Sequence, residues 1–362
     1  MNTKVVMKMN YFDMIKSKGY YVISEIGVNY YDIAKKLNIS NLAAAKLMIK
    51  EAKEAGTDAV KFQTYKAEKI ASRFSPSYWD TTEESTTSQY ELFKKYDLFG
   101  KDEYAELSRY CREIGVEFMS TPFDFEAADY LDDLMDIYKI SSSDLTNLPF
   151  IEHIAKKNKP VILSVGASNE DEITSAVEVI TKHNPHKLTL LHCVLEYPTP
   201  LEDANLNKIV SLKNRYTNMI IGYSDHTKPL ESCDVIKTAF NLGAVVIEKH
   251  LTLDKTLPGN DHYHAMDPDD LRKIVDSLEF MKKIRGSYEL RCLETEFAAR
   301  TNARRSIVAA RDIVNGEVIS QNMITFKRPG HGISPDNVNE VIGKTAIMNI
   351  SEDTIIKPEM IK

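Results

Sequence analysis

The sequence predicts an α/β protein in which a (β/α)₈ TIM barrel is followed by a small C-terminal domain. Short apolar runs rich in β-branched residues alternate with helical patterns along most of the chain of 362 residues. The runs are continuously apolar, which is typical of parallel strands buried on both faces. Eight strand-and-helix units over about 265 residues match the arithmetic of this barrel.

Each predicted element can be located directly. The apolar runs are residues 21–29, 58–65, 117–123, 137–144, 160–166, 188–194, 219–226 and 245–253. The clearest helical patterns are residues 41–56, 102–115, 169–183 and 268–284. Gly56 and Gly115 stand where helices usually end. A doubly wound sheet is the alternative fold, but no Gly-x-Gly-x-x-Gly pattern follows the first strand.

The connection after the second strand is unusually long. Residues 66–100 far exceed the roughly 2–6 residues of an ordinary βα loop, and they carry Trp79 and several tyrosines. We expect such a segment to be functional or to form an interface.

A change of pattern after residue 285 marks a second domain. A polar, basic stretch is followed by short strands punctuated by Gly and Pro. The predicted organisation is a barrel over residues 1–285, a linker over 286–302 and a small domain over 303–362. A domain of about 60 residues can form only a small hydrophobic core, so we expect it to pack against a larger domain or subunit.

Composition and charge exclude several classes of protein. A hydrophobic content of 43% with 18 Tyr and 13 Phe indicates a globular rather than a disordered chain. The net charge of −7 argues against a general nucleic-acid-binding protein, which would carry a basic surface. It is still compatible with a local basic pocket. The four cysteines show no C-x-x-C spacing. With no apolar stretch typical of a signal peptide or membrane span, we expect a cytoplasmic protein without a membrane partner.

Polar residues close each apolar run, at the strand ends where α/β barrels place their active sites. Lysines and hydroxyl donors that converge there would form a small basic pocket suited to a phosphate and a carboxylate together, as in phosphoenolpyruvate. These residues are Lys61, Thr121, Lys139, Ser142, Ser164 and Ser224. Singly, each lysine is more often a surface charge and each serine a local backbone partner, so the joint occurrence is the evidence.

Two histidines indicate a metal site. His226 and His250 end adjacent strands, so their imidazoles can reach one divalent ion and leave positions open for water and substrate. Two neutral nitrogen ligands suit Mn²⁺ first, with Co²⁺ or Mg²⁺ as alternatives. Glu25 or Glu248 would bind or activate a water there. The alternative is a pair of hydrogen-bonded histidines at the barrel rim.

Three further patterns have competing interpretations. His262 and His264 form an alternative metal cluster, but their Gly/Pro-rich loop favours substrate contact or a turn. Residues 166–172 would hold an anion at a helix N-terminus, but their acidic residues better fit ordinary helix capping. Lys139 has an alternative interpretation as the Schiff-base lysine of an aldolase, because barrel aldolases use a desolvated strand lysine.

The sequence resembles the sialic acid synthase family, the phosphoenolpyruvate-dependent nonulosonate synthases. The resemblance runs from about residue 20 to 362. Its segments include SEIGVN at 24–29, VKFQTY at 60–65, YKISSSD at 138–144, IGYSDHT at 221–227, EKHLTLD at 248–254 and PGNDHYHAMDP at 258–268. The tail, with RRSIVAARDIVNGEVIS and FKRPGHGIS, is similar to that family's antifreeze-like (SAF) domain. The resemblance implies a domain-swapped homodimer in which this domain covers the partner's barrel.

The resemblance also implies roles for individual residues. The six pocket residues would hold phosphoenolpyruvate, and His226 and His250 the metal. The residues facing the sugar would be Glu25, Gln63, Tyr197, Asp261 and Arg328, with Arg328 reaching across the dimer. The family reaction condenses phosphoenolpyruvate with an N-acylated mannose-type aldehyde and releases phosphate by C–O cleavage. Lys61 and Lys139 would then stabilise the phosphate, and Glu25 and Glu248 complete the catalytic set.

Three positions depart from the N-acetylneuraminate pattern. Asp144 stands where a glutamate is common, Leu195-Glu196 replaces an amide-bearing dipeptide, and Lys249 replaces an arginine. The first two lie where the sugar would sit, so Asp144 counts among the predicted substrate residues. The sugar stays open between N-acetylmannosamine and a 2,4-diacetamido-trideoxyhexose leading to a legionaminic- or pseudaminic-type acid, and the departures favour the second. The competing classes are a Lys139 Schiff-base aldolase and a non-enzymatic carbohydrate- or ice-binding protein.

Overall fold

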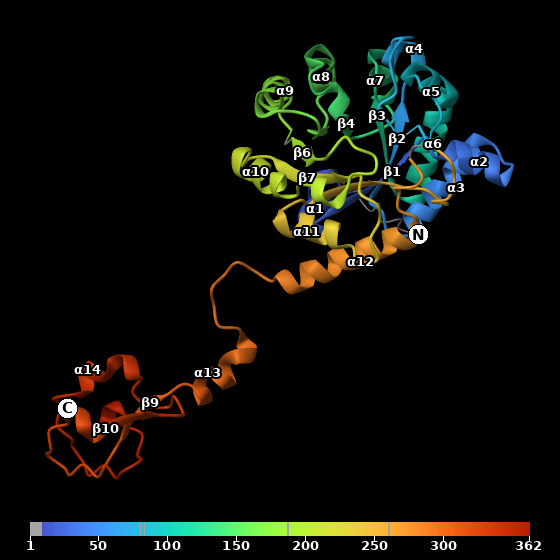
Figure 1. Cartoon of the computed structure of the whole chain (residues 1–362). Coiled ribbons are helices and arrows are strands. Elements are labelled where there is room, and N and C mark those ends of the chain that lie inside the picture. The colour runs from blue at the N-terminus through green and yellow to red at the C-terminus, as the bar shows by residue number, and fades with distance from the viewer. Residues whose placement is uncertain (1–8, 80, 83, 187, 260) are drawn as a thin grey trace, which may run out of the picture. The chain divides into compact units, whose positions relative to one another are not determined.

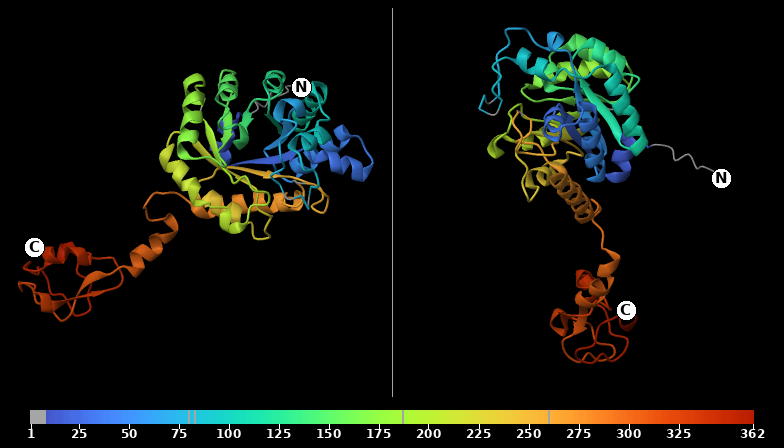
Figure 2. Two further views of the ribbon diagram at one scale, coloured as in Figure 1. Left: turned by 45° about the horizontal axis from the view of Figure 1, so that its top comes forward. Right: turned by 90° about the vertical axis from the view of Figure 1, so that its right-hand side faces the viewer.

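The chain forms two compact units, residues 1–286 and 287–362 (Figure 1). The structure is a computed structural model that describes residues 9–79, 81–82, 84–186, 188–259 and 261–362. The first unit is built on eight parallel strands with helices outside them, and Figure 2 shows this arrangement from two further directions. The predicted (β/α)₈ fold is therefore confirmed.

The eight strands correspond one by one to the predicted apolar runs. They are β1 (Tyr21–Gly27), β2 (Ala59–Thr64), β3 (Glu117–Pro122), β4 (Tyr138–Ile140), β5 (Val161–Ser164), β6 (Thr189–His192), β7 (Ile220–Asp225) and β8 (Val246–His250). Their hydrogen-bonded order is β3-β2-β1-β8-β7-β6-β5-β4. Contacts between β3 and β4 close the barrel.

The helices lie between and around the strands. They are α1 (Tyr11–Lys18), α2 (Tyr30–Leu37), α3 (Asn41–Glu54), α4 (Ala67–Ile70), α5 (Gln89–Tyr96), α6 (Lys101–Ile114), α7 (Phe125–Leu131), α8 (Leu148–Ala155), α9 (Glu170–His183), α10 (Asn207–Arg215), α11 (Asp234–Leu242) and α12 (Pro268–Arg285). The Asn169 side chain accepts a hydrogen bond from Glu172 N (3.0 Å), and the Glu172 carboxylate accepts one from Asn169 N (2.9 Å). This capping box starts α9 and confirms the capping interpretation of residues 166–172.

The barrel interior is apolar at the end where the strands begin. Tyr21, Ile23, Met119 and Ile162 belong to one buried cluster there. Helix α1 packs against this cluster through Tyr11, whose hydroxyl also bonds Thr189 Oγ1 at 2.9 Å. The inward positions therefore change from apolar to polar along the strands, which leaves the carboxyl ends for the site.

A buried ion pair ties β7 to β8 on the side away from the barrel interior. Lys249 Nζ lies 2.7 Å from Asp225 Oδ2 and donates to the Thr227 carbonyl at 2.6 Å. Both charged side chains are 2% exposed. Because His226 and His250 directly follow these residues in the chain, the pair fixes the backbone that carries both histidines.

The second unit has its own small core. It contains α13 (Phe297–Ala303), the antiparallel strands β9 (Ser306–Ala309) and β10 (Ile324–Lys327), and α14 (Val338–Val341). Ile307, Ile313 and Ile350 are buried in it. Across the described part of the whole chain, no helix has the length and apolar character needed to cross a membrane.

The buried pair gives a stability prediction. Lys249→Met leaves the Asp225 carboxylate buried without its cation, and we expect the free energy of unfolding to fall by about 3–5 kcal/mol. Lys273→Met removes the exposed pair with Glu231 and should leave the free energy of unfolding nearly unchanged, because solvent screens this pair. Urea unfolding of both variants measures the difference. Equal effects would contradict a structural role for the Asp225–Lys249 pair.

Candidate active site

Inward-facing side chains meet at the carboxyl ends of the strands. The strand pairing sets Glu25 beside Lys61 on one side and beside His250 on the other. Because side chains alternate along a strand, residues two apart point into the same space. The predicted residues that line the two adjoining cavities there are Glu25, Lys61, Gln63, Thr121, Lys139, Ser142, Asp144, Ser164, Tyr197, Ser224, His226, Glu248, His250 and Asp261.

Four charged side chains form the centre of the smaller cavity. Lys61 Nζ pairs with the Glu25 carboxylate and lies 3.7 Å from Glu248 Oε2. Lys139 Nζ lies 3.6 Å from Glu248 Oε1. Lys61 also donates to Thr121 Oγ1 at 3.1 Å. The pocket that the sequence suggested as basic therefore has two carboxylates placed between its lysines.

Burial and mutual contacts shift the pKa values of these groups in different directions. Burial raises the pKa of Glu25 in spite of the nearby Lys61. Burial also opposes ionisation of Glu248, but Lys139 and Lys61 outweigh it and lower the Glu248 pKa. Burial lowers the pKa of Lys139, whereas the two glutamates hold the Lys61 pKa above its usual value in spite of burial. The site thus contains one carboxyl group that is easily protonated and one ammonium that is easily deprotonated.

Hydroxyl groups surround the charged centre. Ser224 Oγ donates to Glu248 Oε1 at 2.9 Å, and Ser142 Oγ accepts from Gly166 N at 2.8 Å. Ser164 Oγ is buried, and within the described ranges no group bonds to it. An unpartnered buried hydroxyl at this point is available to a ligand, because leaving it unpaired is costly.

Sequence reasoning missed Cys193 as part of this cavity. Its Sγ lies 3.0 Å from Ser142 Oγ, and it lines the small cavity. It follows the inward-facing Leu191 by two residues, so strand alternation would have indicated its direction. The close approach depends on Gly166, where a Cβ would stand 2.7 Å from the sulfur.

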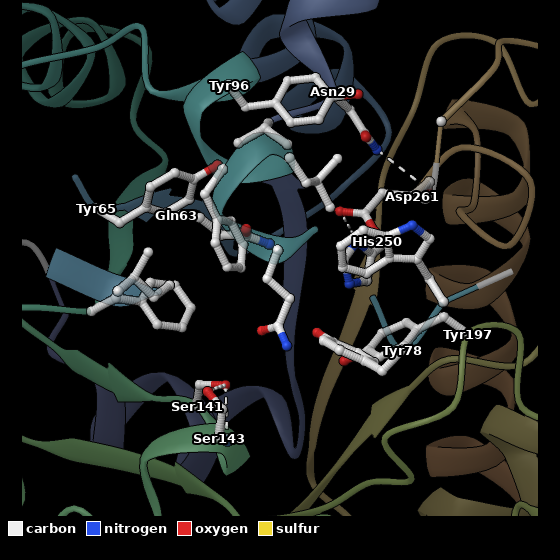
Figure 3. Close-up of a pocket in the computed structure, with 18 of the residues that line it drawn as sticks. Asn29, Gln63, Tyr65, Tyr78, Tyr96, Ser141, Ser143, Tyr197, His250 and Asp261 are labelled. Atoms are coloured by element: carbon white, nitrogen blue, oxygen red, sulfur yellow. Dashed lines mark hydrogen bonds and ion pairs between the residues drawn. The ribbon is translucent and has the colours of Figure 1, made fainter. Parts of the chain in front are cut away.

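A larger cavity of about 610 Å³ adjoins the small one. Gln63, Leu195 and Tyr197 line both cavities, and Gln63 Nε2 donates to Glu25 Oε1 at 3.0 Å. Figure 3 shows Tyr78, Tyr197 and His250 gathered on one side of it. The arrangement offers a compact charged compartment beside a wider compartment with aromatic walls.

The long connection of residues 66–100 builds much of the aromatic wall. Trp79 and Tyr96 from this segment form a buried cluster with Tyr65, and all three line the larger cavity. Trp79 Nε1 donates to the carbonyls of Glu84 and Thr86 at 3.2 and 3.1 Å, which fixes the segment. The expectation that this connection is functional thus has a structural basis.

The two predicted metal histidines are buried and close together. Their ring centroids lie 5.7 Å apart. His226 Nδ1 donates to the Val194 carbonyl at 2.6 Å, so in the neutral ring Nε2 carries the lone pair. Burial lowers the pKa of His226 to about 4, and burial with the neighbouring imidazoles lowers that of His250 well below its usual value. Both rings are neutral at neutral pH, as metal ligands must be.

A third histidine lies where the sequence suggested a turn or a substrate contact. His264 is fully buried, and one ligand atom each of His250, Asp261 and His264 lie within 4.8 Å of one another. His262 instead bonds Thr252 Oγ1 at 2.8 Å and faces Asp32 at 3.3 Å. The two histidines of this loop therefore have different surroundings, which their sequence context did not reveal.

The structure places the remaining predicted residues as follows. Burial raises the pKa of Asp144, which accepts a hydrogen bond from Asn147 Nδ2 at 3.2 Å. Arg328 belongs to the second unit and lies exposed directly after β10. Its predicted role across a dimer stays a prediction.

These features define a class of protein: a barrel enzyme with a charged, hydroxyl-rich compartment beside a wider compartment with aromatic walls. The NeuB family model matches residues 48–289, and the SAF domain model matches residues 304–362. The chain therefore belongs to the NeuB family, and the predicted resemblance to sialic acid synthases is confirmed.

Individual proteins extend this similarity to nearly the whole chain. The chain is 37% identical to the N,N'-diacetyllegionaminic acid synthase of Campylobacter jejuni, with 94% of this chain and 99% of that protein aligned. The Legionella pneumophila enzyme of the same name is 36% identical, with 94% of each chain aligned. The structure of N-acetylneuraminic acid (sialic acid) synthetase from Leptospira borgpetersenii matches with a TM-score of 0.65 and 34% identity, covering 77% of this chain and 90% of that one.

Proposed function

We propose that this protein condenses phosphoenolpyruvate with an N-acylated mannose-type amino sugar to give a nonulosonic acid and phosphate. The observation that carries the proposal is the buried set of Lys61, Lys139, Glu25 and Glu248, ringed by hydroxyls, at the floor of a wider cavity. Two ammonium groups and the unpaired Ser164 hydroxyl suit a molecule with a phosphate and a carboxylate. The synthases among the relatives support the same reaction class.

Phosphoenolpyruvate would occupy the small cavity. Lys61 and Lys139 would pair with its anionic groups, and Ser164 would use its free hydroxyl. Thr121, Ser142 and Ser224 complete the hydroxyl set. Binding a multiply charged anion would raise the pKa of Lys139, because it adds the negative charge that this buried ammonium lacks.

The residues present fit a divalent metal ion between the two cavities. His250 Nδ1 is buried and has no hydrogen-bond partner in the described ranges, and it lies 3.6 Å from Asp261 Oδ2. His226 lines the small cavity, and its Nε2, which carries the lone pair, lies 3.5 Å from Ser224 Oγ. We propose Mn²⁺ first, with Co²⁺ or Mg²⁺ as alternatives. Such an ion, when bound, polarises the sugar aldehyde and lowers the pKa of water.

The chain's own residues would then orient the partners and move protons. The condensation forms a bond between C3 of phosphoenolpyruvate and the aldehyde carbon, adds water at C2 and breaks the bond from C2 to the phosphate oxygen. Glu25 is the proposed acid–base group, because burial raises the pKa of its carboxyl and so makes it a better proton carrier than an exposed glutamate. Lys61 and Lys139 would stabilise the leaving phosphate.

We propose a 2,4-diacetamido-trideoxyhexose as the sugar. Leu195 gives the larger cavity an apolar wall where an amide would hydrogen-bond, and Ile70, Tyr65 and Trp79 extend apolar surface nearby. A 6-deoxy methyl group and a second acetamido group bury more apolar surface there than N-acetylmannosamine does. The two legionaminic acid synthases among the relatives support this choice.

Phosphate release tests both the reaction and the sugar. Phosphoenolpyruvate should release phosphate only with sugar and a divalent ion present, and kcat/KM should be about tenfold or more higher for the diacetamido sugar than for N-acetylmannosamine. Lys139→Met should abolish turnover, and Lys237→Met, on helix α11 outside the barrel, should leave it intact. A higher kcat/KM with N-acetylmannosamine than with the diacetamido sugar would contradict the proposed identity of the sugar. Metal-independent turnover with borohydride trapping at Lys139 would favour the Schiff-base aldolase instead.

The lowered pKa of Lys139 predicts a pH dependence of phosphoenolpyruvate binding. The ammonium form binds the anion, so affinity should decline as pH rises through the lowered Lys139 pKa, below the ordinary lysine value of 10.5. Because the bound anion raises this pKa, binding in that range should take up a proton. Calorimetry in buffers of different ionisation enthalpy measures the uptake, and Lys139→Met should remove it. Binding without proton uptake up to about pH 10 contradicts the assignment.

We further propose that the protein works as a domain-swapped homodimer in which Arg328 of one copy contacts sugar in the partner's barrel. Mixing Arg328→Ala chains with Lys61→Ala chains should restore activity. In each mixed dimer, one of the two sites combines Lys61 of one chain with Arg328 of the other and is therefore intact. Each variant alone should be nearly inactive. Without regained activity after verified subunit exchange, Arg328 does not act across the dimer.

A further inference from the structure

We propose that His264 is a third histidine ligand of the divalent ion held by His226 and His250. The inference rests on the metal part of the proposed function and adds a ligand from the loop that follows β8. The three buried rings form a compact group, with centroid distances of 4.9 Å for His250–His264, 5.7 Å for His226–His250 and 6.4 Å for His226–His264.

These separations agree with shared coordination. A metal–nitrogen bond of about 2.1 Å leaves the centroids of two imidazoles on one ion about 4.6 Å apart at a right angle and about 6.5 Å apart when opposed. All three distances lie inside this range. Each pair alone therefore permits a shared ion. His226 lies outside the group of ligand atoms within 4.8 Å that His250, Asp261 and His264 form, so its ring must move toward them for one ion to contact all three rings.

The backbone of the loop holds His264 in place. Met266 N donates to the His250 carbonyl at 2.8 Å, and Thr252 N donates to the Met266 carbonyl at 2.9 Å. The loop thus returns to the end of β8 and pairs with it through Leu251 and Met266. This brings a residue 14 positions later in the chain against the His250 ring.

Carboxylate and aromatic groups complete the surroundings. Asp261 contributes an oxygen to the same group of ligand atoms. The Tyr197 ring packs 4.2 Å from the His226 centroid and 5.5 Å from that of His264, which limits access of water on that side. Three imidazoles with open remaining positions are the arrangement of a catalytic rather than a closed structural site. Imidazole donors favour Co²⁺ or Zn²⁺ over Mg²⁺.

Cobalt binding to the full-length, metal-free protein tests the ligand count. The Co²⁺ form should show three solvent-exchangeable, paramagnetically shifted imidazole N–H proton signals, one for each histidine. His264→Asn should show two and bind Co²⁺ at least about tenfold more weakly, by competition with a chromogenic chelator. The matched control is His192→Gln, since His192 is also buried at a strand end but donates to the Ala204 carbonyl at 2.8 Å. This variant should keep three signals and the wild-type affinity.

The outcomes separate this inference from the proposed function. Two signals in the wild type, with Co²⁺ affinity unchanged in His264→Asn, overturn the third ligand and leave the reaction and its two-histidine site standing. Absence of Co²⁺ binding overturns the third ligand together with the metal dependence of the proposed function. Circular dichroism checks that His264→Asn folds. If it does not, the wild-type signal count decides alone.

Discussion

The buried charge network inside the barrel is the constraint on which the rest of the site depends. Four ionisable groups lose their hydration at the strand ends, and a buried charge is tolerated only with a partner and hydrogen bonds. Among the described residues, Lys61 has two carboxylates within reach, whereas Lys139 has one, Glu248 at 3.6 Å. The unequal sharing leaves Lys139 short of negative charge. An anion with several charged oxygens would complete the network, so the imbalance that shifts the pKa values would also favour the proposed ligand.

The two cavities are built by different parts of the chain. The charged compartment is built from strand residues whose positions the barrel fixes. The wider compartment is walled by loops, including the segment of residues 66–100 that Trp79 ties together through two backbone carbonyls. The proposed chemistry thus belongs to the strand ends, and the proposed choice of sugar to loop residues such as Leu195. His226 and His250 lie at the boundary between the two cavities, and the buried Asp225–Lys249 pair fixes the backbone that carries them. A metal ion on these histidines would be accessible from both compartments.

The sequence was sufficient to predict the barrel and most of the strand-end residues, because both follow from local patterns. It did not separate inward from outward side chains within a strand end. Alternation resolves this afterwards: Glu248 and His250 face the cavities, while Lys249 between them points outward to Asp225. The position of His264 could not be predicted, because it depends on the loop's return to the His250 backbone. The aromatic wall depends on long-range packing in the same way.

Isotope labelling of phosphoenolpyruvate tests the central claim most directly. The bridging oxygen between C2 and phosphorus is labelled with ¹⁸O, and mass spectrometry locates the label after turnover. The account predicts that all of the label leaves in the phosphate, because the C2–O bond breaks while the lysines hold the leaving group. Label retained at C2 of the nonulosonic acid would mean cleavage of the P–O bond and would contradict the account.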